Sequence, residues 1–475
     1  MDVGPSACPA RISGSFRDPS GYVFERDGRI FRAVNDAAHS LFRELADSGR
    51  LSKLSDDGLT VPTRFVEDSV LQAALAQEHR GFAHFLEHER VPQITYPYEW
   101  SGSMLAAAGL LTLELQLRLL EAGCALKDAS AYNVQFVEGR PVFIDLTSIE
   151  RPARLDLWFA LGQFQRMFLL PLLLSRHCGW DLRSYFLSSL DGRSLEQVRQ
   201  SLSWFDLWRP SLFLDLTLPL LLERKANRSP ALSRDRLERP NQNCQPQLLN
   251  LNRLVSKIRK LAARAAPKTT WSDYTTTCGY EAGAESAKKA LVKSFLEDTR
   301  PGRVLDIGCN TGDYSFIAAD CGAQVVAVDG DSGAIDRLYQ RLRQTPRPIS
   351  PMVIDLANPS PAIGFMNRER ASFLDRIEPD CVLALALIHH LLVSANLSLA
   401  AIRDMFHALT QRHLILEFVP TDDGMFQRLM KFRVDLFQGL TLQSCLEVFT
   451  ERFDVLQQTP IQGSPRTLFL LRKRP

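Results

Sequence analysis

The feature that most constrains the fold is an alternation of apolar strands and helices in the last third of the chain. From about Arg303 onward, helical stretches separate the short apolar segments RVLDI, QVVAVD, PMVID, CVLALAL and HLILEF. This alternation is typical of a parallel sheet with helices on both faces. Two late strands, near Phe453–Leu456 and Arg466–Leu471, predict a terminal hairpin. The sequence therefore predicts an α/β, Rossmann-like sheet over this part of the chain.

A glycine-rich loop follows the first of these strands. The segment VLDIGCNTG occupies residues 304–312, and a helix is predicted to start near Tyr314. Glycine permits positive φ and close approach of a ligand, and a helix N-terminus offers free amides. The spacing D-x-G-x-x-x-G differs from the G-x-G-x-x-G of dinucleotide binders and from phosphate loops with Gly-Lys-Ser/Thr. The next two strands end in Asp329 and Asp355, so three acidic strand ends stand in register.

At these residues the sequence resembles class I S-adenosyl-L-methionine-dependent methyltransferases, over about residues 270–475. The resemblance implies a seven-stranded sheet with an antiparallel last strand and S-adenosyl-L-methionine as cofactor. It implies that Asp329 takes the ribose hydroxyls and that Tyr274 covers the site, although Tyr274 could equally be a packing residue. The cofactor-binding residues that the resemblance implies are Tyr274, Asp306, Gly308, Cys309, Asn310, Gly312, Asp329, Gly330, Asp355, Leu356 and Leu387.

The candidate catalytic groups follow the fourth and fifth strands. A sulfonium methyl group is already activated, so orientation matters most, and a base helps if the nucleophile is a hydroxyl. His389 and His390 follow the fourth strand and Glu417 ends the fifth. The alternative is that the histidine pair caps its strand and packs against the next helix. No metal is expected in this region.

The polar segment between the third and fourth strands is a second candidate region. Residues 358–376 are longer and more polar than a crossover helix needs. Phe365, Asn367, Arg368 and Arg370 could shape an acceptor site there. The alternative is a solvated loop and helix face.

The N-terminal half contains a second motif, LKDASAYNVQFVEGRPVFID, at residues 126–145. Asp128 and Asn133 are five residues apart, and Asp145 follows after a predicted strand pair around Glu138-Gly139. Kinases use this order for the catalytic base and the metal ligands. Before this motif the sequence predicts a hairpin that turns at Asp27-Gly28, helices around 36–55 and 67–90, and a short strand at about 93–99. The motif, with a hairpin at 21–34, resembles a reduced α+β kinase-like domain over about residues 15–225. That resemblance implies a nucleotide or metal site at Asp128, Asn133 and Asp145, with Mg-ATP as the possible ligand.

Several positions depart from the kinase pattern. Leu126 and Lys127 stand where the usual His-x precedes the catalytic aspartate, and no glycine follows Asp145. The hairpin lacks a glycine-rich loop, and Arg32 is a candidate to replace the phosphate-pairing lysine. The alternative is a degenerate domain in which the three polar residues form a buried network.

A basic stretch joins the two halves. The net charge of the chain is +2, yet residues 223–268 hold 12 basic and three acidic residues, a net of +9. We expect a linker and amphipathic helix over residues 226–269, followed by the methyltransferase region at 270–475. Peripheral membrane contact through 248–264 is an alternative. Contact with nucleic acid is not favoured, because the stretch has few aromatic residues.

Cysteine usage and the lack of long apolar segments indicate a cellular compartment. The nine cysteines are widely spaced without a CxxC pair, which is typical of reduced thiols. The first residues contain no apolar core of a secretion signal, and no stretch reaches about 18 apolar residues. The sequence therefore predicts a cytoplasmic protein without a transmembrane segment.

Four motifs together resemble one bacterial family. YPYEWS, LKDASAYNVQF, DLANPSPAIGF and LALALIHHLL are similar to the methyltransferase family that includes the rhizobial nodulation protein NoeA. The resemblance implies methyl transfer to a hydroxyl or amine of a small molecule, saccharide or glycolipid. Two alternatives are a bifunctional kinase-methyltransferase that modifies one acceptor, and a catalytically dead scaffold or regulatory binding protein.

Overall fold

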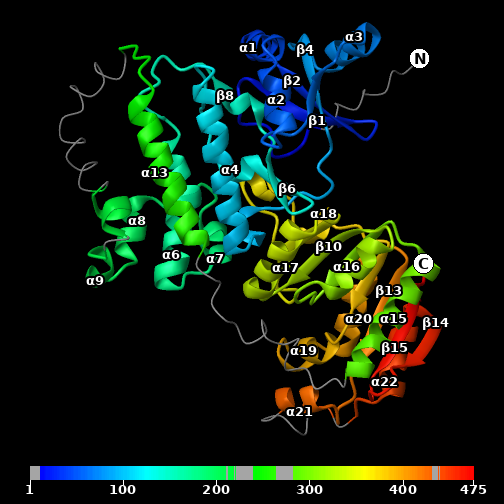
Figure 1. The fold of residues 1–475 in the computed structure, drawn as a ribbon. Coiled ribbons are helices and arrows are strands. Elements are labelled where there is room, and N and C mark those ends of the chain that lie inside the picture. Colours follow the sequence, from blue (N-terminus) through cyan, green and yellow to red (C-terminus); the bar gives the residue numbers. More distant parts are fainter. Residues whose placement is uncertain are drawn as a thin grey trace.

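The structure is a computed structural model, shown as a ribbon in Figure 1. An N-terminal region ends at residue 263 and a C-terminal region begins at residue 282. The residues that the structure describes are 11–209, 212–218, 220, 239–263, 282–430, 437 and 439–475.

A seven-stranded sheet forms the centre of the C-terminal region. Its strand order is β11-β10-β9-β12-β13-β15-β14, and only β15 and β14 break the parallel pattern. This order confirms the predicted Rossmann-like fold with its terminal hairpin. The strands are β9 (Arg303–Ile307), β10 (Gln324–Asp329), β11 (Ile349–Val353), β12 (Cys381–Ala384), β13 (His413–Phe418), β14 (Phe453–Pro460) and β15 (Thr467–Lys473).

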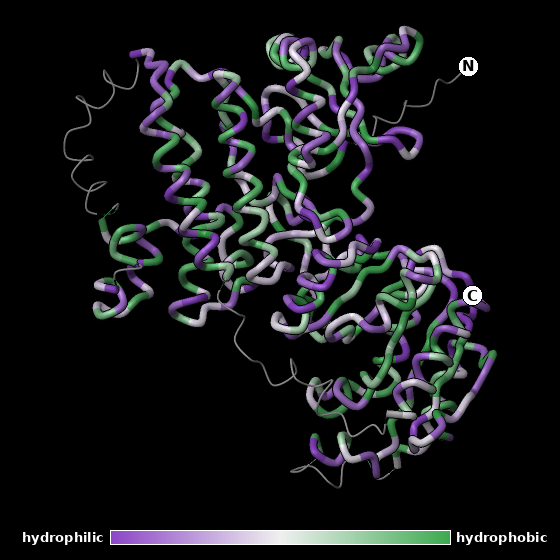
Figure 2. The backbone as a smooth tube through the Cα atoms, viewed as in Figure 1, coloured by the Kyte–Doolittle hydropathy of each residue, from purple (hydrophilic) through white to green (hydrophobic). Residues whose placement is uncertain are grey.

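Helices cover this sheet. Its central strands are almost wholly buried and appear as apolar green tubes, whereas many outward helix positions are purple (Figure 2). Helices α16 and α17 pack against β10 and β11, and α20 packs against α22. The helices are α15 (Ala282–Thr299), α16 (Asp313–Asp320), α17 (Ser332–Gln344), η6 (Phe365–Asn367), α18 (Phe373–Arg376), α19 (Ile388–Val393), α20 (Leu399–Leu409), α21 (Gly424–Met430) and α22 (Leu442–Thr450).

The N-terminal region begins with a four-stranded antiparallel sheet in the order β1-β2-β4-β3. Asp27 and Gly28 both have positive φ, as a two-residue hairpin turn requires, so the predicted hairpin is confirmed. The helix expected over 67–90 is too long, because β4 pairs with β2 and β3. The elements are β1 (Gly21–Arg26), β2 (Arg29–Val34), α1 (Asp36–Asp47), α2 (Arg50–Asp56), β3 (Thr63–Phe65), α3 (Ser69–Glu78) and β4 (His84–His88).

A layer of helices built on α4 (Gly102–Leu120) follows that sheet. Helix α4 is long and apolar enough to cross a membrane, but 67% of its apolar window is buried, as in a core helix. The strand predicted at 93–99 is wrong: its end forms the 3-10 helix η1 (Pro97–Glu99), in which the Glu99 carboxylate accepts a hydrogen bond from the Tyr96 amide. The other helices are η2 (Ala131–Asn133), η3 (Leu146–Ser148), α5 (Leu161–Phe164), η4 (Gln165–Leu169), α6 (Leu170–Cys178), α7 (Leu182–Ser188), α8 (Leu195–Gln200), α9 (Trp204–Leu207), η5 (Phe213–Thr217) and α13 (Gln245–Ala262).

Two short strand pairs complete this region. The hairpin of β6 (Val134–Val137) and β7 (Arg140–Phe143) turns at Glu138 and Gly139, as predicted. Strands β5 (Ala125–Leu126) and β8 (Ile149–Glu150) pair beside it.

The amphipathic helix expected in the basic stretch is α13, which covers Gln245–Ala262. Leu251, Leu254 and Ile258 are fully buried, and α13 packs along α4. Its apolar face therefore belongs to the core of the N-terminal region and is not available to a bilayer. Residues 226–238 and 264–269 of the expected linker lie outside the described residues.

Candidate functional site

The loop between β9 and α16 forms the base of the site. Gly308 and Gly312 have φ values of 70° and 86°, and Asn310 also has positive φ. A Cβ atom at Gly312 would lie 2.4 Å from the Leu338 Cδ1 atom, so glycine is required there for both conformation and space. The Asn310 Oδ1 atom is buried and has no hydrogen-bond partner among the described residues. The loop thus offers an unsatisfied acceptor beside a glycine-lined turn.

Asp329 ties the second strand to this loop. One Asp329 carboxylate oxygen accepts a hydrogen bond from the Asn310 amide at 3.0 Å, and the other accepts from the Asp331 amide at 2.8 Å. Burial raises the pKa of Asp329. Each oxygen keeps a further lone pair, so the carboxylate can still accept two hydroxyl groups. The acidic strand end and the glycine loop therefore meet, as the sequence predicted.

Two of the predicted cofactor residues, Asp306 and Cys309, are buried at the base of the loop. The Asp306 carboxylate accepts a hydrogen bond from the Ser315 hydroxyl at 2.5 Å, and burial raises its pKa to about 6. This bond links β9 to α16 beneath the loop. Burial raises the pKa of the Cys309 thiol, which keeps it protonated and unreactive.

The other predicted cofactor residues border the same loop. A Cβ atom at Gly308 would lie 3.4 Å from the Leu387 side chain. Gly330 lies against the backbone of Asp355, which is exposed, and Leu356 is buried. The carboxyl ends of β9, β10, β11 and β12 thus bring these residues to one edge of the sheet. Tyr274 lies outside the described residues.

The histidine pair begins α19 directly after β12. His389 is 1% exposed, and its ring stacks on Phe426 with centroids 5.7 Å apart. Neither ring nitrogen of His389 has a hydrogen-bond partner among the described residues. Burial lowers the pKa of His389 to about 3 and that of His390 to about 4. Both imidazoles are therefore neutral at pH 7.

Glu417 lies in a buried network of charges. Its carboxylate contacts the Lys288 ammonium at 2.7 Å and the Arg466 guanidinium at 3.2 Å. Arg466 also pairs with Asp423, through two hydrogen bonds of 2.7 and 3.1 Å. Through these ion pairs Glu417 links the end of β13 to Lys288 of α15 and to Arg466 just before β15.

Two of the four residues expected to shape an acceptor site, Phe365 and Arg370, contact the N-terminal region. The Phe365 ring lies 5.6 Å from that of Phe16, and the Arg370 guanidinium lies 4.5 Å from the Tyr132 ring centre. Asn367 and Arg368 are exposed. The segment is longer than a crossover helix needs because it forms part of the contact between the two regions.

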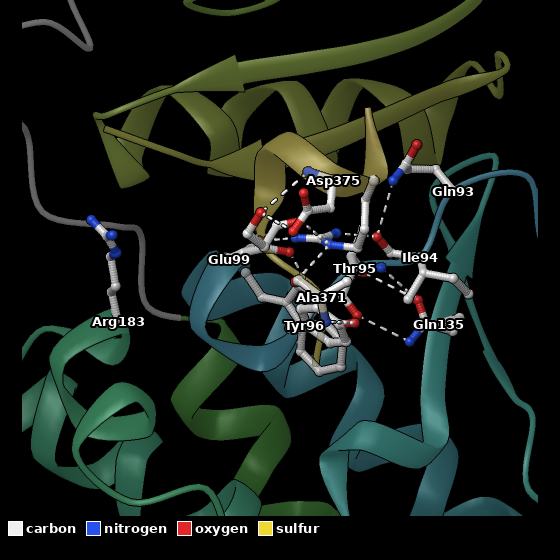
Figure 3. Close-up of polar contacts among 12 residues, drawn as sticks. Gln93, Ile94, Thr95, Tyr96, Glu99, Gln135, Arg183, Ala371 and Asp375 are labelled. Carbon is white, nitrogen blue, oxygen red and sulfur yellow. Dashed lines mark hydrogen bonds and ion pairs between the residues drawn. The ribbon is translucent and has the colours of Figure 1, made fainter. Parts of the chain in front are cut away.

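The motif YPYEWS is the other side of this contact (Figure 3). The Glu99 carboxylate is fully buried and forms an ion pair with Arg376, and the Tyr96 hydroxyl accepts a hydrogen bond from the Ala371 amide at 3.2 Å. Two residues beyond the motif, the amide and hydroxyl of Ser103 donate to Asp336 of α17, each at 2.9 Å. These roles carry no local sequence signal, because no pattern around Tyr96 or Ser103 indicates a partner more than 200 residues away.

Asn133 and Asp145 of the N-terminal motif meet at the Ser148 hydroxyl, and Asn133 also contacts the backbone of Asp128. The Asn133 amide donates to the Asp128 carbonyl at 3.5 Å and to the Ser148 hydroxyl at 3.4 Å. Asp145 accepts from Ser148 at 2.5 Å and from the buried Arg32 guanidinium at 2.6 Å. Arg32 thus occupies the carboxylate that would hold a metal. No group of three metal-ligating side chains occurs among the described residues.

Comparison with known proteins agrees with this geometry. A family model described as a methyltransferase domain matches residues 280–452. The nodulation protein NoeA of Rhizobium meliloti (strain 1021) is 34% identical over 478 residues, covering 98% of this chain and 97% of NoeA. This chain belongs to the NoeA family. Its C-terminal region is a class I S-adenosylmethionine-dependent methyltransferase domain, as the sequence predicted.

Solved structures show weaker likenesses. The N-methyltransferase NodS from Bradyrhizobium japonicum WM9 is 15% identical, with a TM-score of 0.31, over 41% of this chain and 99% of NodS. The bifunctional kinase-methyltransferase WbdD is 16% identical, with a TM-score of 0.28, over 40% of this chain and 39% of WbdD. The fold assignment therefore rests on the strand order and the family match.

Proposed function

We propose that this chain transfers a methyl group from S-adenosyl-L-methionine to a hydroxyl or amine of a small molecule, saccharide or glycolipid. The observation that supports the proposal is the hydrogen bond from the Asn310 amide of loop 308–312 to the Asp329 carboxylate. Gly308 and Gly312 give the loop its left-handed backbone, and the buried Asn310 Oδ1 atom lacks a partner among the described residues. These residues fit the cofactor, because Asp329 can accept its ribose hydroxyls while the loop borders its methionine part.

The chemistry divides between the cofactor and the chain. When bound, S-adenosyl-L-methionine supplies a methyl group already activated on a sulfonium. The loop and Asp329 would hold the bound cofactor in one orientation. In intramolecular model reactions, correct orientation accounts for a large part of the rate enhancement. The imidazoles of His389 and His390 are neutral at pH 7 and can accept a hydrogen bond from the hydroxyl or amine of the acceptor, whereas pKa values of about 3 and 4 make them weak bases for complete proton removal. A donor from the acceptor would also satisfy His389, whose buried nitrogens are costly to leave unpaired.

A transfer assay tests the proposal. The chain, incubated with methyl-labelled cofactor and extracts of cellular metabolites and glycolipids, is expected to label an acceptor. Asp329→Asn removes the carboxylate but not the fold, and we expect it to weaken cofactor binding at least tenfold in calorimetry. Asp320→Asn is the matched control, because Asp320 is an exposed carboxylate paired with Arg347. Absence of cofactor binding by the unaltered chain would contradict the proposal.

For the N-terminal region, we propose a degenerate kinase-like domain that supports the methyltransferase rather than a working phosphotransferase. This proposal is supported by the Asp145 carboxylate, which accepts hydrogen bonds from Arg32, Thr147 and Ser148. A cation already neutralises the carboxylate that magnesium would need. Calorimetry with Mg-ATP is expected to show no binding; binding that is lost in Asp145→Ala would instead support the bifunctional kinase-methyltransferase.

A further inference from the structure

An exposed aromatic cluster lies on α9 and η5, far from the candidate cofactor site. Trp204, Phe205 and Trp208 are 63%, 68% and 67% exposed. Leu214 and Leu218 of the following turn are exposed as well. Large apolar side chains gathered this way on a surface mark an interaction site. In Figure 1, α9 stands at the outer edge of the helical layer, on the side away from the seven-stranded sheet.

These exposed side chains lie on α9, at its C-terminal end and along η5, two elements that pack against each other. We call them the aromatic patch: Trp204, Phe205, Trp208, Leu214 and Leu218. Trp204 and Phe205 have centroids 4.0 Å apart, and Trp208 stacks on Phe213 at 5.7 Å. The exposed fractions of these side chains, from 36% for Leu218 to 68% for Phe205, are those of an open surface. The patch is therefore a protruding surface rather than a pocket for a small ligand.

Positive charge borders the aromatic patch. The buried Asp215 of η5 contacts Arg253 at 2.7 Å and Lys257 at 2.9 Å, so α13 lies directly beside the patch. Lys260 is exposed and lies one turn beyond Lys257 on the same face of α13. Arg253 and Lys257 share the Asp215 carboxylate, and Lys260 adds an exposed positive charge, so these four side chains carry a net charge of +2. The chain that follows the patch also belongs to the basic stretch 223–268.

We propose that the aromatic patch and the basic face of α13 dock this protein on an anionic lipid bilayer. Tryptophan favours the interface between headgroups and acyl chains, and nearby cations attract anionic lipids. A second copy of the chain fits less well, because a two-fold interface would bring the same positive face against itself. The apolar half of this surface comes from α9 and η5, since the apolar face of α13 is buried against α4. This inference does not depend on the methyl acceptor.

Sedimentation of the full chain with vesicles tests this docking. We expect binding to vesicles of phosphatidylcholine and phosphatidylglycerol (3:1) and much weaker binding to phosphatidylcholine alone. The triple variant Trp204→Ser, Phe205→Ser, Trp208→Ser is expected to bind at least tenfold more weakly. Lys260→Ser should lower binding about fivefold, which corresponds to ~1 kcal/mol per cation at an anionic surface. Val70→Ser, an exposed apolar residue on α3, should bind like the unaltered chain.

Other outcomes would contradict docking on an anionic bilayer. Equal binding to both kinds of vesicle, or full binding by the triple variant, would overturn the proposal. A drop in oligomeric mass caused by the triple variant without vesicles would assign the patch to self-association and overturn it as well. If the triple variant fails to fold, tryptophan quenching of the unaltered chain by brominated lipid decides: quenching supports docking, and its absence refutes it.

Discussion

Replacing Arg376 by methionine tests the contact between the two regions. Glu99 is fully buried and Arg376 is 8% exposed by side chain. Arg376 also donates to the carbonyls of Ala371 and Ser372, at 3.3 and 3.2 Å, and to that of Ile94. Arg376→Met leaves a buried carboxylate without its cation, and breaking a buried pair in this way costs about 3–5 kcal/mol.

Removing both charges should cost much less. In Glu99→Gln with Arg376→Met, the glutamine oxygen can still accept the hydrogen bond that Glu99 accepts from the Tyr96 amide at 2.9 Å. A neutral side chain has no large desolvation penalty, so we expect a total cost of about 1–2 kcal/mol. The two substitutions should therefore couple by roughly 2–3 kcal/mol in a double-mutant cycle.

Hydrogen exchange is the suitable assay, because a chain of this size need not unfold in one step. Peptides from 358–376 should exchange roughly a hundredfold faster or more in Arg376→Met, since 1.4 kcal/mol corresponds to a factor of ten. Glu87→Gln is the control, because Glu87 pairs with Arg29 and Arg64 within the N-terminal sheet. The reasoning would be refuted if Arg376→Met exchanged like the unaltered chain or if the double variant were as destabilised as Arg376→Met.

Three further predictions concern single sites. The unfolded pKa of His389 is about 6.5 and its folded pKa is about 3, so the unfolded state takes up the proton between these values. The free energy of unfolding should therefore decrease by about 1.4 kcal/mol for each pH unit between pH 6.5 and pH 3 because of His389. His389→Leu should remove this contribution to the pH dependence measured by urea unfolding. Gly312→Ala should lose about 1–3 kcal/mol of stability and most cofactor binding in calorimetry, because its Cβ atom would clash with Leu338; unchanged binding would contradict the described loop. Asp145→Asn should destabilise the chain by about 3 kcal/mol, since it leaves the Arg32 charge buried and unpaired; a normal melting temperature would indicate a role in ligand binding instead.

Local patterns were enough to predict the parts of the fold that depend on neighbours in sequence. The hairpin turns at Asp27-Gly28 and Glu138-Gly139 followed from residues that tolerate positive φ. The order of apolar strands after Arg303 predicted the sheet, because parallel strands buried on both faces are continuously apolar. The strand predicted near Gln93 was wrong, since Glu99 bonds its own backbone there and pairs with a residue far along the chain.

The candidate cofactor site was predictable for a geometric reason. Parallel strands bring their carboxyl ends to one edge, so Asp306, Asp329 and Asp355 had to lie near one another. The role of Glu417 was not predictable, because Lys288 and Arg466 reach it from opposite ends of the C-terminal region. The segment 358–376 was likewise ambiguous, since its polarity fits an acceptor site, a solvated loop or an interface equally well.

The sequence alone determined the Rossmann-like sheet, the glycine loop with its acidic strand ends and the family of the chain, because these depend on periodicity, on backbone conformation and on short motifs. The tertiary structure decided which polar groups are already engaged. Arg32 forms an ion pair with Asp145, Arg376 forms an ion pair with Glu99, and α4 buries the apolar face of α13. An ion pair or a helix face is satisfied by whatever the fold brings within a few ångströms, and separation in sequence does not reveal that partner.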